Sequence, residues 1–251
     1  MKKLSLKKVS IFTAIIYTAL IGLGMYTAFH INGTSYDNPA MVKTLIWFEI
    51  IMTLFAVVMS VKFFSWQQLG FTKIDKKNIA WLLPMAITAI VILFTMTSFM
   101  SQAQISAQQW QLFTVVGITT LLVGFSEELV YRGIVFSAFF KDSQIKALWV
   151  SAVIFSLLHS VNVVAGLEVS GMLMQLAMTF IAGLFFALVR IKIQSIIPLM
   201  IFHWLWDFNL IGGEVLQAGD TNSLFTTAFI LFELVVVCFY LPYYIYKLKR
   251  P

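Results

Sequence analysis

The segment "IAWLLPMAITAIVILFTMTSFM", residues 79–100, contains no charged side chain over its whole length. A helix that crosses the ~30 Å hydrocarbon layer of a membrane needs roughly 20 mostly apolar residues, and this segment is long enough. Similar apolar runs lie on both sides of it, near residues 9–30, 40–63, 110–132, 147–165, 172–189, 195–212 and 224–246. The segment and its neighbours predict an all-α polytopic membrane protein with about eight transmembrane helices.

The composition of the whole chain agrees with a membrane protein. Hydrophobic residues make up 60% of the sequence, charged residues make up 11%, and the mean hydropathy is +0.91. These values exclude a water-soluble globular domain. No internal repeat and no polar domain separates the apolar runs, so residues 1–251 are interpreted as a single transmembrane domain. The single cysteine, Cys238, excludes a disulfide framework within the chain.

The positions of Lys and Arg predict the orientation, because short cytoplasmic loops retain basic residues. Of the 17 basic residues, only Lys43 and Arg132 fall outside alternate connections and the two chain ends. The remaining basic residues are Lys2, Lys3, Lys7, Lys8, Lys62, Lys73, Lys76, Lys77, Lys141, Lys146, Arg190, Lys192, Lys247, Lys249 and Arg250. Both termini are therefore predicted to be cytoplasmic, and we expect a multi-pass protein of a cell membrane, the bacterial plasma membrane.

The net charge of +6 follows from this topology. It is not accompanied by a basic stripe or by an aromatic reading module, so a nucleic acid is not an expected partner. The expected partners are the lipid bilayer and a substrate within it. An excess of basic residues also suits the anionic inner leaflet of a membrane.

Several ionisable residues lie inside the predicted spans, where a charge costs a few kcal/mol or more and usually marks function. Lys43, Glu49 and Glu233 stand alone, and we interpret them as interface or pairing residues. Six others are grouped by their spacing: Glu127, Glu128, Arg132, His159, His203 and Asp207. Residues four apart share one helix face, and counting ~1.5 Å of rise per residue places the group at a common depth. The pattern predicts one buried polar cavity.

Carboxylates, imidazoles and a guanidinium in one cavity suit hydrolysis, which needs a base for water and donors for an oxyanion. Two other interpretations use the same residue types. In the first, the charges only neutralise one another. In the second, they form the proton relay of a small transporter, although the two halves of the chain lack the matching Gly- or Pro-broken segments of inverted repeats.

Three motifs occur in order on the predicted helices of this region. They are E-E-x-x-x-R from Glu127 to Arg132, F-x-x-x-H from Phe155 to His159, and H-x-x-x-D from His203 to Asp207. Together they resemble the CPBP family, which comprises the type II CAAX prenyl endopeptidases and the bacterial Abi and bacteriocin-immunity proteins. The resemblance covers residues 124–208, and the catalytic core is expected over about residues 110–212. Motifs of other intramembrane proteases, such as H-E-x-x-H and G-x-S-G, are absent from the sequence.

The resemblance implies roles for these residues. Glu127 with His159 would activate a water, and His203 with the residue four positions later would stabilise the tetrahedral oxyanion. Glu128 and Arg132 would orient the site. At the last motif position prenyl endopeptidases commonly have Asn, whereas this chain has Asp207. An ionised carboxylate cannot donate a hydrogen bond to an oxyanion, so this residue must be protonated, bind a metal or position His203.

The resemblance leaves the catalytic type open. If zinc is used, Glu127, His159 and His203 would bind it with water in the fourth place; a metal-free glutamate mechanism is the alternative, and no other cofactor is expected. The predicted function is that of an intramembrane endopeptidase acting on a peptide or a membrane-anchored protein, in bacteriocin self-immunity or in peptide processing. The alternatives are a non-proteolytic bacteriocin-immunity protein and a small transporter.

Overall fold

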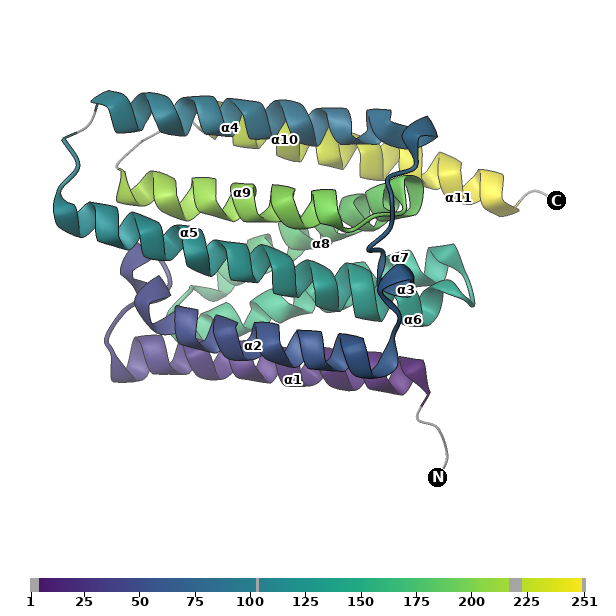
Figure 1. Ribbon diagram of the computed structural model, residues 1–251, viewed down its shortest axis with the longest axis horizontal. Coiled ribbons are helices and arrows are strands. Elements are labelled where there is room, and N and C mark those ends of the chain that lie inside the picture. The colour runs from purple at the N-terminus through teal and green to yellow at the C-terminus, as the bar shows by residue number, and fades with distance from the viewer. Residues whose placement is uncertain (1–4, 103, 217–222, 250–251) are drawn as a thin grey trace.

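The computed structural model describes residues 5–102, 104–216 and 223–249, and within these ranges every regular element is a helix. The long helices run side by side along one axis (Figure 1). The α-helices are α1 (Leu6–Tyr26), α2 (Val42–Phe63), α3 (Trp66–Leu69), α4 (Leu83–Gln102), α5 (Ala107–Glu128), α6 (Phe136–Phe140), α7 (Gln144–Leu158), α8 (Val169–Ile193), α9 (Ile197–Val215), α10 (Ser223–Val235) and α11 (Leu241–Lys249). Short 3₁₀ or π segments join them: η1 (Thr27–Ile31), η2 (Pro39–Met41), η3 (Lys76–Leu82), η4 (Leu129–Val135), η5 (His159–Ala165) and η7 (Val236–Tyr240). The predicted all-α class is confirmed.

Seven helical stretches of the described chain are long and apolar enough to cross a membrane. They are Leu6–Ile31, Pro39–Phe63, Lys76–Ser101, Ala107–Phe140, Gln144–Ala165, Val169–Ile193 and Thr226–Leu248. The remaining predicted span, near residues 195–212, corresponds to α9, which packs along α5 and α4 but is not among the seven. Its polar site residues, His203 and Asp207, lower its hydropathy. The chain is therefore a polytopic helical membrane protein, and its interior helix α9 is less apolar than the other long helices.

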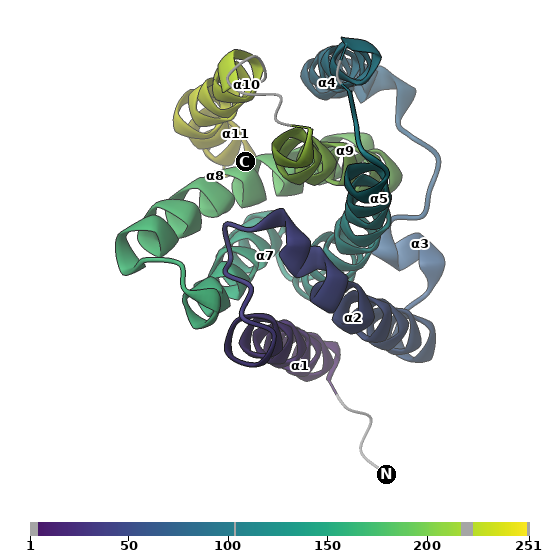
Figure 2. The same ribbon diagram turned by 90° about the vertical axis from the view of Figure 1, so that its left-hand side faces the viewer.

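The helices surround a central pair formed by α5 and α9. Figure 2, which looks along the helices, shows α1 and α2 on one side of this pair, α7 and α8 on a second side, and α4 and α10 outermost. The pairs α5–α9, α7–α8 and α2–α5 make extensive contacts. Side chains that project between α5, α7 and α9 are consequently shielded from the surroundings of the bundle.

Small residues allow the central helices to touch. A Cβ atom at Gly124 of α5 would lie 2.6 Å from the backbone nitrogen of Trp204 and 3.0 Å from the carbonyl oxygen of Met200, both in α9. At Gly183 of α8 a Cβ atom would lie 3.0 Å from the Cα atom of Ala152 in α7. Helices in membranes associate by such close packing of small residues. The contact at Gly124 places the end of α5 beside the middle of α9.

Basic side chains gather at one end of the bundle. Lys7 of α1 forms an ion pair with Asp142, and the ammonium of Lys146 lies 3.9 Å from the same carboxylate. These cations hold the pKa of Asp142 below its usual value. The start of α1 and the end of α11 also lie at this end (Figure 1). Which side of a membrane this end faces stays a prediction, and Lys2, Lys3 and Arg250 lie outside the described residues.

Candidate active site

The first motif lies where a regular helix becomes a wide one. The α-helix α5 ends at Glu128, and the chain continues without a break as the π-helical segment η4. Every residue from Ser126 to Phe136 is buried, because helices pack against this segment on all sides. π-turns inside helices are rare and occur frequently at functional sites. Here the hydroxyl of Ser151 in α7 donates a hydrogen bond of 2.9 Å to the carbonyl of Tyr131, which lies within the wide turn.

Glu128 and Arg132 form an ion pair at the centre of this segment. The guanidinium Nη1 atom lies 2.8 Å from the Oε1 atom of Glu128, and both side chains are shielded from solvent. The guanidinium also lies over the ring of Phe155, 3.9 Å from its centroid, which is a favourable cation–π arrangement. A buried charge is strongly unfavourable unless it is paired, so each of these two residues requires the other.

His203 of α9 connects the carboxylates of the site. Its Nδ1 atom lies 3.0 Å from the Oε1 atom of Glu128, and because a carboxylate only accepts, the imidazole donates this hydrogen bond. Its Nε2 atom faces the Oδ2 atom of Asp207 at 3.4 Å and the Oε2 atom of Glu127 at 3.9 Å. That oxygen of Glu127 is buried without a hydrogen-bond partner among the described residues. The structure thus brings five of the six predicted residues together around one imidazole.

His159 is the sixth predicted residue, and it joins the group less directly. It follows the last residue of α7, and its Nδ1 atom donates a hydrogen bond of 3.1 Å to the carbonyl of Phe155. The ring of Phe155 packs edge-on against His159, with centroids 5.2 Å apart, and against His203, with centroids 6.0 Å apart. No carboxylate of the described chain lies within 4.0 Å of His159. A bond of His159 to Glu127 would therefore require a bridging water.

The site is closed at one side and open at the other. The side chain of Glu128 is 0% exposed and that of His203 is 10% exposed, whereas that of Asp207 is 25% exposed. His159 is also half-buried. A substrate would therefore reach the imidazole from the side of Asp207 and His159, with the pair of Glu128 and Arg132 behind it.

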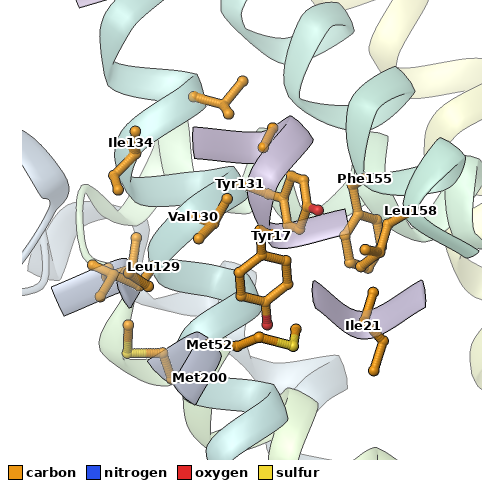
Figure 3. Close-up of a cluster of buried hydrophobic side chains, with 14 of the residues drawn as sticks. Tyr17, Ile21, Met52, Leu129, Val130, Tyr131, Ile134, Phe155, Leu158 and Met200 are labelled. Atoms are coloured by element: carbon orange, nitrogen blue, oxygen red, sulfur yellow. The ribbon is translucent and has the colours of Figure 1, made fainter. Parts of the chain in front are cut away.

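Sequence analysis did not identify Tyr17 and Ser126, which lie beside the candidate site. The hydroxyl of Tyr17 in α1 lies 2.6 Å from the hydroxyl of Ser126, the residue before Glu127. The ring of Tyr17 also meets that of Tyr131 edge-on, at 6.1 Å between centroids. Figure 3 shows the rings of Tyr17, Tyr131 and Phe155 gathered in one buried apolar cluster. A tyrosine in an apolar run gives no sequence signal of such a role, because it serves packing equally well.

Glu49 of α2 is another part of this neighbourhood that sequence analysis interpreted differently. It is 2% exposed, and its Oε2 atom has no hydrogen-bond partner in the part of the chain that the structure describes. It interacts electrostatically with Glu127, His203 and Asp207. In the sequence, the only indication of such a position was that Glu49 is an isolated acid in an apolar span. The structure places Glu49 beside the candidate site and not at a membrane interface.

A polar chain lies near the open side of the site. The amide of Asn162 donates a hydrogen bond of 2.8 Å to Gln175, whose own amide donates one of 2.6 Å to the hydroxyl of Tyr36. Tyr36 lies in the connection between α1 and α2, and partial burial raises the pKa of its phenol above the ordinary value. The phenol therefore keeps its proton, which is free to be donated. Tyr36 also interacts electrostatically with Asp207 and Glu127.

Sequence analysis left open a zinc set of Glu127, His159 and His203. Among the described residues, no three His, Cys, Asp or Glu side chains are grouped so that they could hold a metal ion. His159 uses its Nδ1 atom for the Phe155 carbonyl, which leaves Nε2 as the nitrogen available to a water or a metal ion, and the ring of Phe155 packs against both His159 and His203.

Comparison with known proteins gives one family. Residues 108–209 match the family model described as type II CAAX prenyl endopeptidase Rce1-like, and this stretch contains all three motifs. Comparisons with curated proteins and with solved structures give no match. The matched residues comprise α5, η4, α6, α7, η5, α8 and most of α9, which are the elements that build the site. The region that carries the site is thus similar to the Rce1-like type II CAAX prenyl endopeptidases, and this match supports a CAAX-type intramembrane protease.

Proposed function

We propose that this chain is an intramembrane endopeptidase in which Glu127 activates the water that hydrolyses a peptide bond. The observation that carries the proposal is the unpartnered Oε2 atom of Glu127, buried 3.9 Å from the Nε2 atom of His203. An unpartnered carboxylate oxygen can accept a hydrogen bond from a water. A general base within hydrogen-bond reach of its water is the first requirement for this chemistry.

In the proposed mechanism the water lies between Glu127 and His159. The tautomer that donates Nδ1–H to the Phe155 carbonyl leaves the Nε2 lone pair of His159 free to accept a hydrogen bond from this water. Glu127 removes a proton as the water oxygen attacks the substrate carbonyl carbon. When the tetrahedral intermediate collapses, Glu127 returns that proton to the leaving amine, and the peptide C–N bond breaks.

His203 stabilises the oxyanion in this mechanism. Its Nδ1–H is donated to Glu128, and its Nε2 atom faces the space between Glu127 and Asp207. With protons on both nitrogens, the ring donates from Nε2 to the oxygen that becomes negative. Such preorganised donors contribute much of the rate enhancement in acyl transfer. Asp207 acts on His203 by keeping the proton on Nε2, which accounts for a carboxylate at this position.

The substrate in this proposal is a peptide or a membrane-anchored segment that enters from the side of Asp207. The half-buried Asp207 and His159 form the open side, and Tyr36 offers a phenolic proton close to it. A polar donor near the entrance suits a backbone carbonyl of an extended peptide. Bacteriocin self-immunity and peptide processing are both processes in which such a cleavage would serve.

Hydrolysis of CAAX peptides, with and without a prenyl group, by the purified protein in lipid nanodiscs tests the proposal. Glu127→Gln keeps the size of the side chain but removes the base, so the rate should fall on the order of 100-fold or more. Glu214→Gln is the matched control, because Glu214 is an exposed acid of α9 outside the site. It should keep full activity.

Undiminished cleavage by Glu127→Gln would contradict the role of Glu127. If neither peptide is cleaved by the native protein, protection of cells against a bacteriocin is measured instead. Protection that survives both Glu127→Ala and His203→Ala would indicate binding without cleavage and would overturn the proposal.

A further inference from the structure

Arg190 is a buried cation outside the site. It lies in the last turn of α8, at the end of the bundle where the basic residues gather, and it is 8% exposed. Its Nε atom is buried without a hydrogen-bond partner, and no carboxylate of the described residues forms an ion pair with it. Arg132, in contrast, has Glu128. An uncompensated buried charge is costly, so a chain that keeps one is expected to provide an anion for it.

Packing rather than a counter-ion holds the guanidinium in place. Gly70 has a φ angle of +98°, and a Cβ atom there would lie 2.5 Å from Nη2 and 2.6 Å from Cζ of Arg190. The guanidinium therefore occupies space that only a glycine leaves free. On its other contact it lies 5.7 Å from the ring centroid of Phe136. The guanidinium thus packs closely against the backbone of Gly70.

A cavity of about 370 Å³ opens beside this guanidinium. Its walls include the basic side chains of Lys141 and Arg190 and the amides of Gln67, Gln68 and Gln144, and none of the described residues that line it is acidic. Amide and guanidinium N–H groups are hydrogen-bond donors, and both charges are positive. The cavity is therefore complementary to an oxyanion such as a phosphate, which Arg binds with two parallel hydrogen bonds.

A second, apolar cavity of about 680 Å³ adjoins the first at Thr72, which lines both. It lies between α4 and α9, and its walls include Met85, Ala89, Ile201 and Phe202. The side chains of Lys73 and Lys76 stand at its edge. A donor-rich cationic cavity next to an apolar groove suits a molecule with an anionic head and an apolar tail.

We propose that these two adjoining cavities bind an anionic phospholipid, with its phosphate at Arg190 and its acyl chains between α4 and α9. The bundle end that contains the cavities carries the basic residues, and such an end faces the anionic leaflet when the positive-inside rule holds. The lipid phosphate supplies the negative charge that Arg190 lacks. The bound lipid also ties α4, an outer helix, to the ends of α8 and α9.

Thermal unfolding of the detergent-purified protein, titrated with short-chain lipids, tests this proposal. Dioctanoyl phosphatidylglycerol should raise the midpoint of unfolding, because a ligand that binds only the folded state stabilises it. Dioctanoyl phosphatidylcholine, which has the same chains and no net charge, should give a much smaller shift. Glycerol 3-phosphate, which has the head without the chains, should bind more weakly than the lipid.

Arg190→Gln should weaken the binding of phosphatidylglycerol about tenfold or more, since it removes a charge-assisted contact to phosphate. Lys192→Gln is the matched control, because it removes the same charge only two residues away. The Lys192 side chain lies over the ring of Tyr244, 4.0 Å from its centroid. It should bind as the native protein does. Should Arg190→Gln fail to fold, Ala86→Phe replaces it as the test, because the larger side chain fills the apolar groove. This variant should weaken the binding of the lipid but leave the binding of glycerol 3-phosphate unchanged.

Equal shifts with phosphatidylglycerol and phosphatidylcholine would overturn the proposal, since the charge of the head would then be irrelevant. Glycerol 3-phosphate or inorganic phosphate that binds as tightly as the lipid would overturn the assignment to a lipid, because the groove would contribute nothing. A loss of binding in Lys192→Gln equal to that in Arg190→Gln would show that only the general charge of this end matters.

Discussion

Glu128 holds two partners at once, the guanidinium of Arg132 at 2.8 Å and the imidazole of His203 at 3.0 Å. Replacing both Glu128 and Arg132 by leucine removes the two members of a buried ion pair together. Such replacements are often neutral for stability, so the variant should fold and unfold at nearly the native temperature. It should cleave peptide on the order of 100-fold more slowly, because His203 loses the acceptor that orients it.

Single replacements at the same pair separate charge from orientation. Arg132→Leu alone leaves the carboxylate of Glu128 buried without its cation, which should cost about 3–5 kcal/mol of stability. Unfolding in detergent and peptide cleavage, measured on the same preparations, distinguish the variants. A double variant that is both stable and fully active would show that the pair does not position the site.

Among the elements, the contact between α5 and α9 decides whether the site can form. Gly124→Ala would put a methyl group 2.6 Å from the backbone nitrogen of Trp204, and a backbone atom cannot move aside as a side chain can. The two helices must separate, which should cost about 1–3 kcal/mol as overpacking does. The same separation moves Glu127 from His203, so the cleavage rate should fall as well.

Gly117→Ala provides the control within the same helix. A methyl group there would lie 3.3 Å from the Cε2 atom of Phe208, which is a side-chain atom that can rotate away. This variant should unfold close to the native temperature and keep its activity. Equal losses in both variants would mean that any methyl group on this face of α5 is harmful and that Gly124 has no special part.

For the whole molecule, the alternation of basic and acidic connections predicts which side each end of the bundle faces. Cysteine labelling in a Cys238→Ser background measures it, because Cys238 is the single cysteine of the sequence. Ser35→Cys, at the end without the basic cluster, should react with a membrane-impermeant maleimide in intact cells. Lys77→Cys should react only after the membrane is made permeable. Both positions are exposed, so the opposite pattern would reverse the predicted orientation.

The helical class and the clustering of the motif residues could be predicted from the sequence, because both depend on local patterns. Apolar runs reveal membrane helices, and residues four apart on a helix meet, as Glu128 does with Arg132. The π-turn after Glu128 has no such pattern, since its residues also occur in ordinary α-helices. The sequence also could not predict that the Glu49 side chain is buried, because an apolar span does not reveal which of its faces packs against neighbouring helices.

The position of His159 shows the same limit within a motif. The spacing to Phe155 correctly places the two side chains on one face, with ring centroids 5.2 Å apart. It does not reveal that the helix changes to a 3₁₀ turn at His159 and that the Nδ1 atom bonds the Phe155 carbonyl. Contacts between helices, unlike contacts within one helix, require knowledge of how the helices are rotated.

The low hydropathy of α9 has a consequence for biosynthesis. A charged residue at the centre of a helix adds ~2.5–3.5 kcal/mol to the free energy of leaving the translocon for lipid, and α9 carries Asp207 near its middle. This helix is made after α5, so its partner surface, with Gly124 and Glu128, is already in the membrane when α9 emerges. Insertion of α9 is therefore coupled to docking on a completed neighbour. A defect in α5 would be expressed first as a chain whose last helices have the wrong topology, before any catalytic step is reached.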